Sequence, residues 1–170
     1  MSLLPEVPNS PMPIRLIGAA VDWTIVIMGA IMITLVFTNV VTHLFGKDIA
    51  WTTELCELLM VWVTFLGGAA AARRGAHMSI TEFIDKLGGS RRRAADALIQ
   101  LIVIGVLGLL TIYGWRITEA GWNNELTVLG WPMSAQNIAL PIASVLTMLF
   151  AGWDLLQITQ GKSRLERYGE

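Results

Sequence analysis

Two glutamates, Glu54 and Glu57, lie within an apolar stretch in the first half of the chain. Because they are three residues apart, their carboxylates share one face of a helix. At ~1.5 Å of rise per residue, Glu57 lies roughly 7–9 Å beyond Trp51, which marks the start of the stretch. An ionised carboxylate at that depth must face protein or water. Three roles fit: a proton or ion site, an ion pair with a partner subunit, and a snorkelling acid near Arg116. We favour structural pairing over a direct role in transport.

The two histidines, His43 and His77, are of the residue type that binds haem iron from two sides. The hydropathy pattern places His43 at the outer end of the first apolar run and His77 at the inner end of the second. They are therefore about a membrane thickness apart and cannot bind one iron, so we predict no haem and no other cofactor. The sequence also contains no phosphate-binding loop, metal-ligand cluster or nucleophile–base set. We therefore predict no catalytic or metal-binding residue, and we do not expect an enzyme.

The composition is typical of a membrane protein. Hydrophobic residues make up 54% of the 170 residues and charged residues only 15%, whereas a soluble domain carries about 25% charged residues. The single cysteine, Cys56, excludes an intrachain disulfide. We predict one membrane domain, residues 16–153, between two polar tails, residues 1–15 and 154–170.

Four apolar runs are long enough to cross a bilayer core of ~30 Å. The first run is too long for the core of a signal peptide, so we interpret it as a transmembrane helix. Pro141 lies within the last run and is expected to kink it or to mark a tight helix contact. The predicted spans are residues 16–42, 52–72, 94–115 and 132–153.

A short amphipathic segment, residues 79–87, follows the second span. Ser79 and Glu82 have the spacing of a capping box, which favours a helix start. The apolar side chains are spaced for one helical face, and they predict a helix that lies in the cytoplasmic membrane surface. These side chains are Ile80, Phe83, Ile84 and Leu87.

The basic residues predict the orientation. With four spans, both termini and the middle loop share one side, and that side holds every lysine and arginine except Lys47 and Arg116. The positive-inside rule therefore places both termini in the cytoplasm. The basic loop at residues 73–93 is explained by this topology and by anionic lipid, so we expect no nucleic-acid partner. The predicted fold is an all-α integral membrane protein with four transmembrane helices plus a cytoplasmic interfacial helix.

Two stretches carry a resemblance to a known family. The first has W-x-x-E at residues 51–54 and then VWVTFLGGAAAARRGAHMSI at residues 61–80. The second is ELTVLGWPMSAQNIALPIAS at residues 125–144. In this order they resemble the small membrane subunit of tripartite ATP-independent periplasmic (TRAP) transporters, the DctQ-like family. The proline-rich N-terminal tail and the unbroken alanine run depart from that pattern.

The resemblance implies a subunit of a sodium-coupled secondary transporter for a carboxylate-bearing solute in the bacterial inner membrane. In that family a large membrane subunit carries the sodium and substrate sites, the small subunit braces it, and a periplasmic substrate-binding protein delivers the solute. The lipid bilayer is the remaining partner. We predict a large-subunit interface at Trp51, Glu54, Glu57, Val61, Phe65, Gly67, Gly68 and Ala72.

The longer outer connection, residues 118–131, is expected to help dock the binding protein. It mixes aromatic anchors with hydrogen-bonding groups, which is typical of protein interfaces. The alternative is that Trp122 and Trp131 only anchor the chain at the membrane surface. The predicted docking residues are Trp122, Asn123, Asn124 and Glu125.

Two other classes of protein compete with this interpretation. A membrane anchor subunit of a redox enzyme complex would bind haem or quinone, which an absorbance spectrum would reveal. A small integral membrane enzyme would need an acid or nucleophile cluster near the membrane surface, and the sequence shows none.

Overall fold

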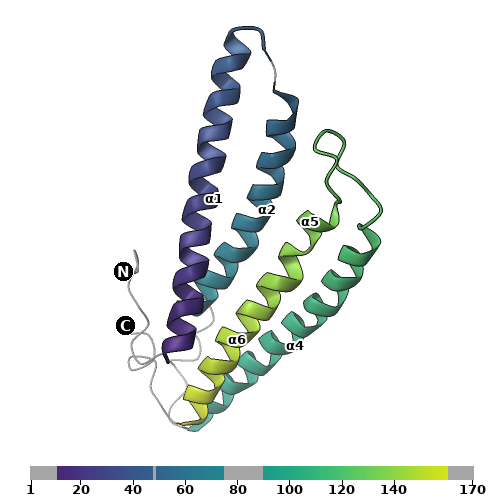
Figure 1. The fold of residues 1–170 in the computed structure, drawn as a ribbon. Helices are drawn as coiled ribbons and strands as arrows, with labels where there is room; N and C mark the ends of the chain where they lie inside the picture. The colour runs from purple at the N-terminus through teal and green to yellow at the C-terminus, as the bar shows by residue number, and fades with distance from the viewer. Residues whose placement is uncertain (1–10, 48, 75–89, 161–170) are drawn as a thin grey trace.

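The computed structural model describes residues 11–47, 49–74 and 90–160, with side chains described from residue 94 onward in the last range. Within these ranges the chain is helical, and the only β pairing is an isolated bridge between Glu125 and Pro132. The predicted interfacial segment, residues 79–87, lies outside the described residues. The helices, drawn in Figure 1, are α1 (Met12–Leu44), α2 (Ala50–Arg73), α4 (Ser90–Ala120), α5 (Ser134–Asn137) and α6 (Ala139–Thr159).

Four segments are long and apolar enough to cross a membrane, which confirms the predicted all-α fold with four transmembrane helices. α1 has 33 residues, so it is about 50 Å long at the usual helical rise. That length exceeds a ~30 Å hydrocarbon core, so α1 must tilt or project beyond it. The crossing segments are Met12–Leu44, Ala50–Arg73, Ala94–Ala120 and Ser134–Thr159.

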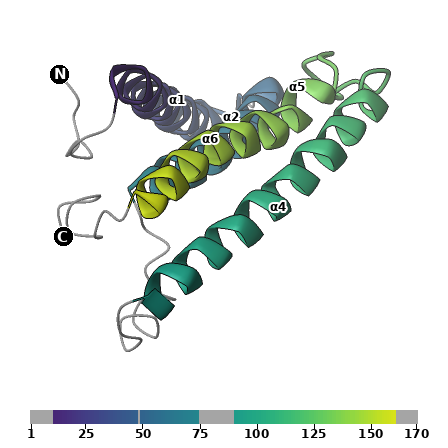
Figure 2. The ribbon, with the colours of Figure 1, turned by 90° about the horizontal axis from the view of Figure 1, so that it is seen from below.

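The four long helices form two antiparallel hairpins, α1 with α2 and α4 with α6 (Figure 1). The two hairpins meet through α2 and α6, so the spatial order is α1, α2, α6, α4. Figure 2 shows α1 and α4 on opposite sides of the molecule, with α2 and α6 between them. The helices therefore form an open row and do not close into a bundle.

The buried core is small for a chain of this length. Its cluster consists of Val21 on α1 with Leu66 and Ala70 on α2. Trp62 and Leu146 pack against this cluster and extend it towards α6. Most large apolar side chains of α1 and α4 are instead exposed. In a membrane, lipid or a partner protein covers such faces.

Pro141 lies in the first turn of α6, directly after α5 and α6 meet at Ile138. Its missing N–H costs little there, because the first-turn donors of a helix have no intrahelical acceptor. A Cβ built on Gly114 of α4 would lie 3.0 Å from Pro141 Cδ and 3.2 Å from Leu140 Cδ2. The proline therefore marks a tight α4–α6 contact, which is one of the two outcomes expected from the sequence.

Candidate functional site

The connection between α4 and α5 folds into a short hairpin, residues 124–133, which we call the loop hairpin. The Leu126 amide donates to the Trp131 carbonyl and the Met133 amide donates to the Asn124 carbonyl, both at 2.7 Å. Gly130 has φ of 64°, in the left-handed region that glycine adopts at low cost. These bonds give the connection a defined shape (Figure 1).

Glu54, in the second turn of α2, contacts the tip of the loop hairpin. The Val128 amide nitrogen lies 3.0 Å from Oε1 and 2.9 Å from Oε2 of Glu54. The Leu129 amide nitrogen lies 2.8 Å from Oε2. Two consecutive backbone donors therefore converge on one carboxylate, and the Glu54 side chain is half-buried.

Glu57, one turn further along α2, has a different environment. Its side chain is exposed and has no hydrogen-bond or ion-pair partner among the described residues. The guanidinium of Arg116, which the sequence suggested as a partner, lies over the Tyr113 ring at 5.7 Å. The two glutamates that share a helix face therefore differ: Glu54 binds the loop hairpin, and Glu57 has no partner among the described residues.

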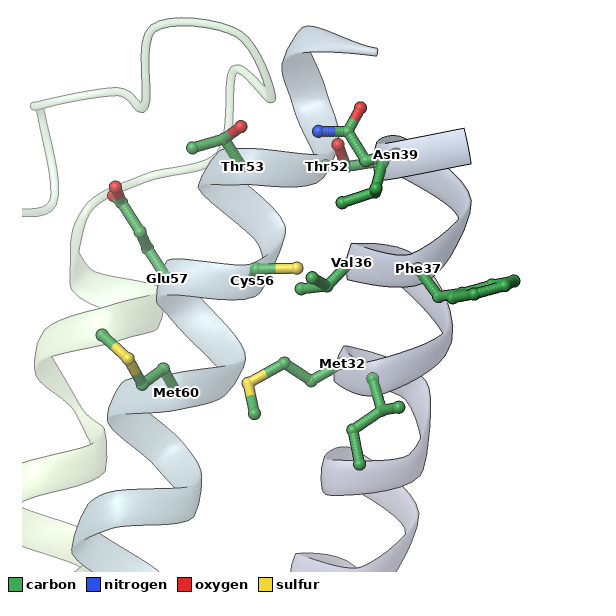
Figure 3. Close-up of a pocket in the computed structure, with 11 residues that line it drawn as sticks. Met32, Val36, Phe37, Asn39, Thr52, Thr53, Cys56, Glu57 and Met60 are labelled. Atoms are coloured by element: carbon green, nitrogen blue, oxygen red, sulfur yellow. The ribbon is translucent and has the colours of Figure 1, made fainter. Parts of the chain in front are cut away.

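An apolar groove of about 730 Å³ runs between α1 and α2 beside Glu57. Figure 3 shows Met32 and Val36 of α1 on the side of the groove that Cys56 of α2 faces, whereas the Met60 side chain points away from α1. Glu57 is at its edge and points away from α1 (Figure 3). Among the described residues, no group pairs with this carboxylate.

The remaining predicted large-subunit contacts lie further along α2. Phe65, Gly68 and Ala72 line a second groove of about 370 Å³, whose other walls are α4 and α6. A Cβ built on Gly67 or Gly68 would meet no atom within 4 Å. These glycines therefore serve no close helix contact among the described residues. Trp51 is exposed and Val61 is half-buried.

The four predicted docking residues all lie on the exposed side of the connection that contains the loop hairpin. Trp122 is the most prominent, with 68% of its surface exposed. Val128 and Trp131 of the loop hairpin also have about half of their surfaces exposed. The connection between α4 and α5 that contains these residues lies in the upper part of Figure 1. The exposed predicted docking residues are Trp122, Asn123, Asn124 and Glu125.

The predicted membrane-surface contacts lie outside the described residues, and so does His77. These contacts are Ile80, Phe83, Ile84 and Leu87.

Asp22, whose role the sequence pattern did not indicate, is only 6% exposed. Its carboxylate accepts hydrogen bonds from Arg73 at 2.6 Å and from Arg74 at 2.8 Å. A Cβ on Gly18 would overlap the Arg73 guanidinium, so this glycine provides the space for the pair. The acid is near the start of the first span and the two arginines are at the end of the second, so all three lie at a similar depth in the membrane. This similar depth was the feature of the sequence that could have indicated the pairing.

Two side-chain hydrogen bonds join helices that are distant in sequence. Trp62 Nε1 of α2 donates to the Ala135 carbonyl of α5 at 3.0 Å. Gln100 Nε2 of α4 donates to the Ala151 carbonyl of α6 at 3.0 Å. Such bonds between membrane helices favour one register over its alternatives.

The polar groups of the described helices thus hold helices and loops together. Within the described residues, no group of three or more histidine, cysteine, aspartate or glutamate side chains could hold a metal ion. Four crossing helices, an ordered hairpin at one end and a paired acid near the other define a small multi-pass membrane subunit.

Comparison with known proteins identifies the family. The model for the DctQ component of the tripartite ATP-independent periplasmic transporters matches residues 32–161. The chain therefore belongs to this family of small TRAP permease subunits. It is a transporter subunit and not an enzyme, and it is a multi-pass protein of the inner membrane.

Three relatives illustrate the similarity. The sialic acid TRAP transporter small permease protein SiaQ of Vibrio cholerae is 28% identical over 122 residues, which cover 72% of this chain and 70% of SiaQ. The C4-dicarboxylate TRAP transporter small permease protein DctQ of Rhodobacter capsulatus is 29% identical over 130 residues, 72% of this chain and 53% of DctQ. The ectoine TRAP transporter small permease protein TeaB of Halomonas elongata is 27% identical over 125 residues, which cover 69% of this chain and 65% of TeaB.

Proposed function

We propose that this chain braces the large membrane subunit of a sodium-coupled, binding-protein-dependent transporter for a carboxylate-bearing solute. The bracing unit is the single membrane domain, residues 16–153, and both tails are cytoplasmic. The names of two relatives, a sialic acid and a C4-dicarboxylate transporter subunit, support a carboxylate solute. The basic residues Arg73 and Arg74 at the inner end of α2 support the orientation.

The observation that carries the bracing role is the open face of α2. This helix is central in the row, with α1 and α6 as neighbours, yet one stripe of it stays exposed. The stripe runs from the Glu57 carboxylate through Met60 and Phe65 to Gly68. Lipid hydrocarbon solvates a carboxylate poorly and makes few contacts with a glycine. A partner helix can instead pair a basic group with the carboxylate and pack closely against the glycine.

We assign the large-subunit interface to this stripe. Glu57 pairs there with a basic group of the large subunit, and Gly67 and Gly68 let a helix of that subunit approach the α2 backbone. Glu54, which the sequence pattern also placed in this interface, lies outside the stripe, with its carboxylate turned to the loop hairpin. The other contacts are Trp51, Val61, Phe65 and Ala72.

A Gly68→Leu substitution tests the bracing role. The added side chain enters the groove that a partner helix would use, so we expect about tenfold less large subunit to co-purify, as for a loss of ~1.4 kcal/mol. Uptake driven by a sodium gradient should fall in proportion in reconstituted vesicles. Gly29→Leu on α1 is the matched control, because a Cβ there also meets no atom within 4 Å. Equal co-purification of both variants would contradict the interface.

The loop hairpin and the residues before it form the docking surface for the periplasmic binding protein. Exposure of Trp122 and of the polar residues 123–125 supports this role, because aromatic and hydrogen-bonding groups together are typical of interfaces. A membrane-anchoring role for Trp122 and Trp131 alone would not require the polar residues between them.

A further inference from the structure

The contact between Glu54 and the loop hairpin is a long-range one within the chain. Glu54 and Leu129 are separated by 75 residues, so neither local helix geometry nor the turn itself brings them together. Both carboxylate oxygens accept backbone N–H groups, at 2.8–3.0 Å. Bonds of this kind to an ionised acceptor are about twice as strong as neutral ones.

The loop hairpin needs an external attachment of this kind. Its two sides are joined by the Leu126–Trp131 and Asn124–Met133 backbone bonds. An isolated two-stranded hairpin is marginally stable in water. The tip amides of Val128 and Leu129 turn towards α2, and among the described residues Glu54 is the acceptor that they meet.

A second attachment holds the base of the hairpin to the same helix. Trp62 Nε1 donates to the carbonyl of Ala135, two residues after the hairpin ends. Glu54 and Trp62 both belong to α2, whereas the chain enters the connection from α4. The tip and the base of the hairpin are thus both bound to α2, and the position of the hairpin follows that helix.

We propose that Glu54 is a positioning residue that holds the loop hairpin in the orientation that receives the periplasmic binding protein. This inference rests on the docking role proposed above. The carboxylate fixes the amide of Val128, which has 49% of its surface exposed, and Trp131 of the same hairpin has 50% exposed. The same contact therefore extends the docking surface to the tip of the hairpin. Holding a loop in its bound shape strengthens association by reducing the entropy lost on binding.

This role differs from the one that the sequence suggested for Glu54. The Glu54 carboxylate is directed to the loop hairpin, where its two oxygens accept the Val128 and Leu129 amides. Glu57 has no such partner among the described residues, so we assign the contact with a cation of the large subunit to Glu57. The two glutamates are thus assigned to two partners, the hairpin for Glu54 and the large subunit for Glu57.

The test uses Glu54→Gln in the assembled transporter, reconstituted in lipid. Glutamine keeps the size of the side chain but removes the charge and replaces one acceptor oxygen with a donor. We expect the Val128 and Leu129 amides to exchange with deuterium about tenfold faster, because local opening becomes easier. The concentration of binding protein that gives half-maximal uptake should rise about threefold or more. The maximal uptake rate and the amount of co-purified large subunit should not change.

Glu119→Gln is the matched control. It removes a carboxylate near the same end of the molecule, on α4, where Glu119 accepts a hydrogen bond from Trp115 Nε1 at 2.8 Å and does not contact the hairpin tip. This variant should leave the exchange of Val128 and Leu129, and the half-maximal concentration, at their original values.

The possible results separate the inference from the proposed function. Unchanged amide exchange in Glu54→Gln overturns the inference, and so does a loss of large subunit from the complex, which would return Glu54 to that interface. Faster exchange with an unchanged requirement for binding protein overturns the docking role of the hairpin and, with it, the positioning role. Faster exchange with a higher requirement supports both.

Discussion

Asp22 shows how one buried charge is accommodated in a membrane helix. Its carboxylate accepts hydrogen bonds from Arg73 and Arg74 and is 6% exposed. The arginine side chains keep 13% and 32% of their surfaces exposed, so water still reaches part of the cluster. Removing one member of such a cluster leaves its partners as uncompensated charges, which costs more than the pair itself is worth.

We expect Asp22→Asn to destabilise the subunit by about 2–3 kcal/mol, below the usual cost for a fully buried pair because both arginines keep some access to water. Thermal unfolding of the purified complex measures this change. A second substitution, Arg74→Gln, should cost less in the Asp22→Asn background than alone, because the pair is already broken. Additive losses would show that the two side chains do not interact.

At this scale the sequence identified the charged residues but not their partners. The spacing of Glu54 and Glu57 made them equivalent, since both lie on one helix face. They differ because a loop 74 residues away folds back onto Glu54 and stops short of Glu57. Asp22 was visible as the charge in the first span, but its pairing depends on the register between two helices. Periodicity within one helix contains no information about that register.

Individual helices were more accessible to prediction than their contacts. Hydropathy located four crossing segments, and the part of the chain that the structure describes has four. It did not predict that α5 and α6 are separate helices meeting at Ile138, because the predicted span, residues 132–153, runs through both without a break. The α4–α6 contact depends on Gly114, whose missing side chain makes room for Pro141 and Leu140. A glycine in a membrane helix is common, so only the neighbouring helix reveals its function.

Gly114→Val should separate α4 from α6. A Cβ at this position already lies 3.0 Å from Pro141 Cδ, and valine adds two methyl groups beyond it. Overpacking of this kind costs typically about 1–3 kcal/mol. Gly108→Val, two turns earlier on α4, is the control, because a Cβ there meets no atom within 4 Å. The melting temperatures of the two variants in detergent should differ, with Gly114→Val the lower, and equal values would refute the contact.

The whole molecule is an open row of helices, and its arrangement in the membrane follows from charge. Figure 1 places the start of α1, the end of α2, the start of α4 and the end of α6 at one end. Arg73 and Arg74 belong to that end, whereas the loop hairpin is at the other. Hydropathy and charge together predicted that successive helices cross the membrane in opposite directions, with the basic helix ends on one side. They could not predict the spatial order α1, α2, α6, α4, which depends on side-chain fit between helices.

Cysteine labelling tests the orientation of the row. In a Cys56→Ser background, a cysteine at Ser90 should react only with a reagent that enters the cytoplasm, because we place the start of α4 inside. A cysteine at Asn123 should react with a reagent confined to the periplasm. Labelling of both positions from the periplasm would exclude the four-span topology with cytoplasmic termini.

The open row of helices also has a consequence for the ratio in which the two membrane subunits accumulate. A copy of this chain without its large subunit exposes the Glu57 carboxylate and the α2 glycines to lipid, with few buried contacts of its own to offset the cost. Assembly adds the missing contacts, so the folded state is stabilised by mass action when the large subunit is present. Surplus copies are correspondingly more exposed to membrane proteases. We therefore expect the open shape of the subunit to limit its copy number, since copies without a partner would be degraded first.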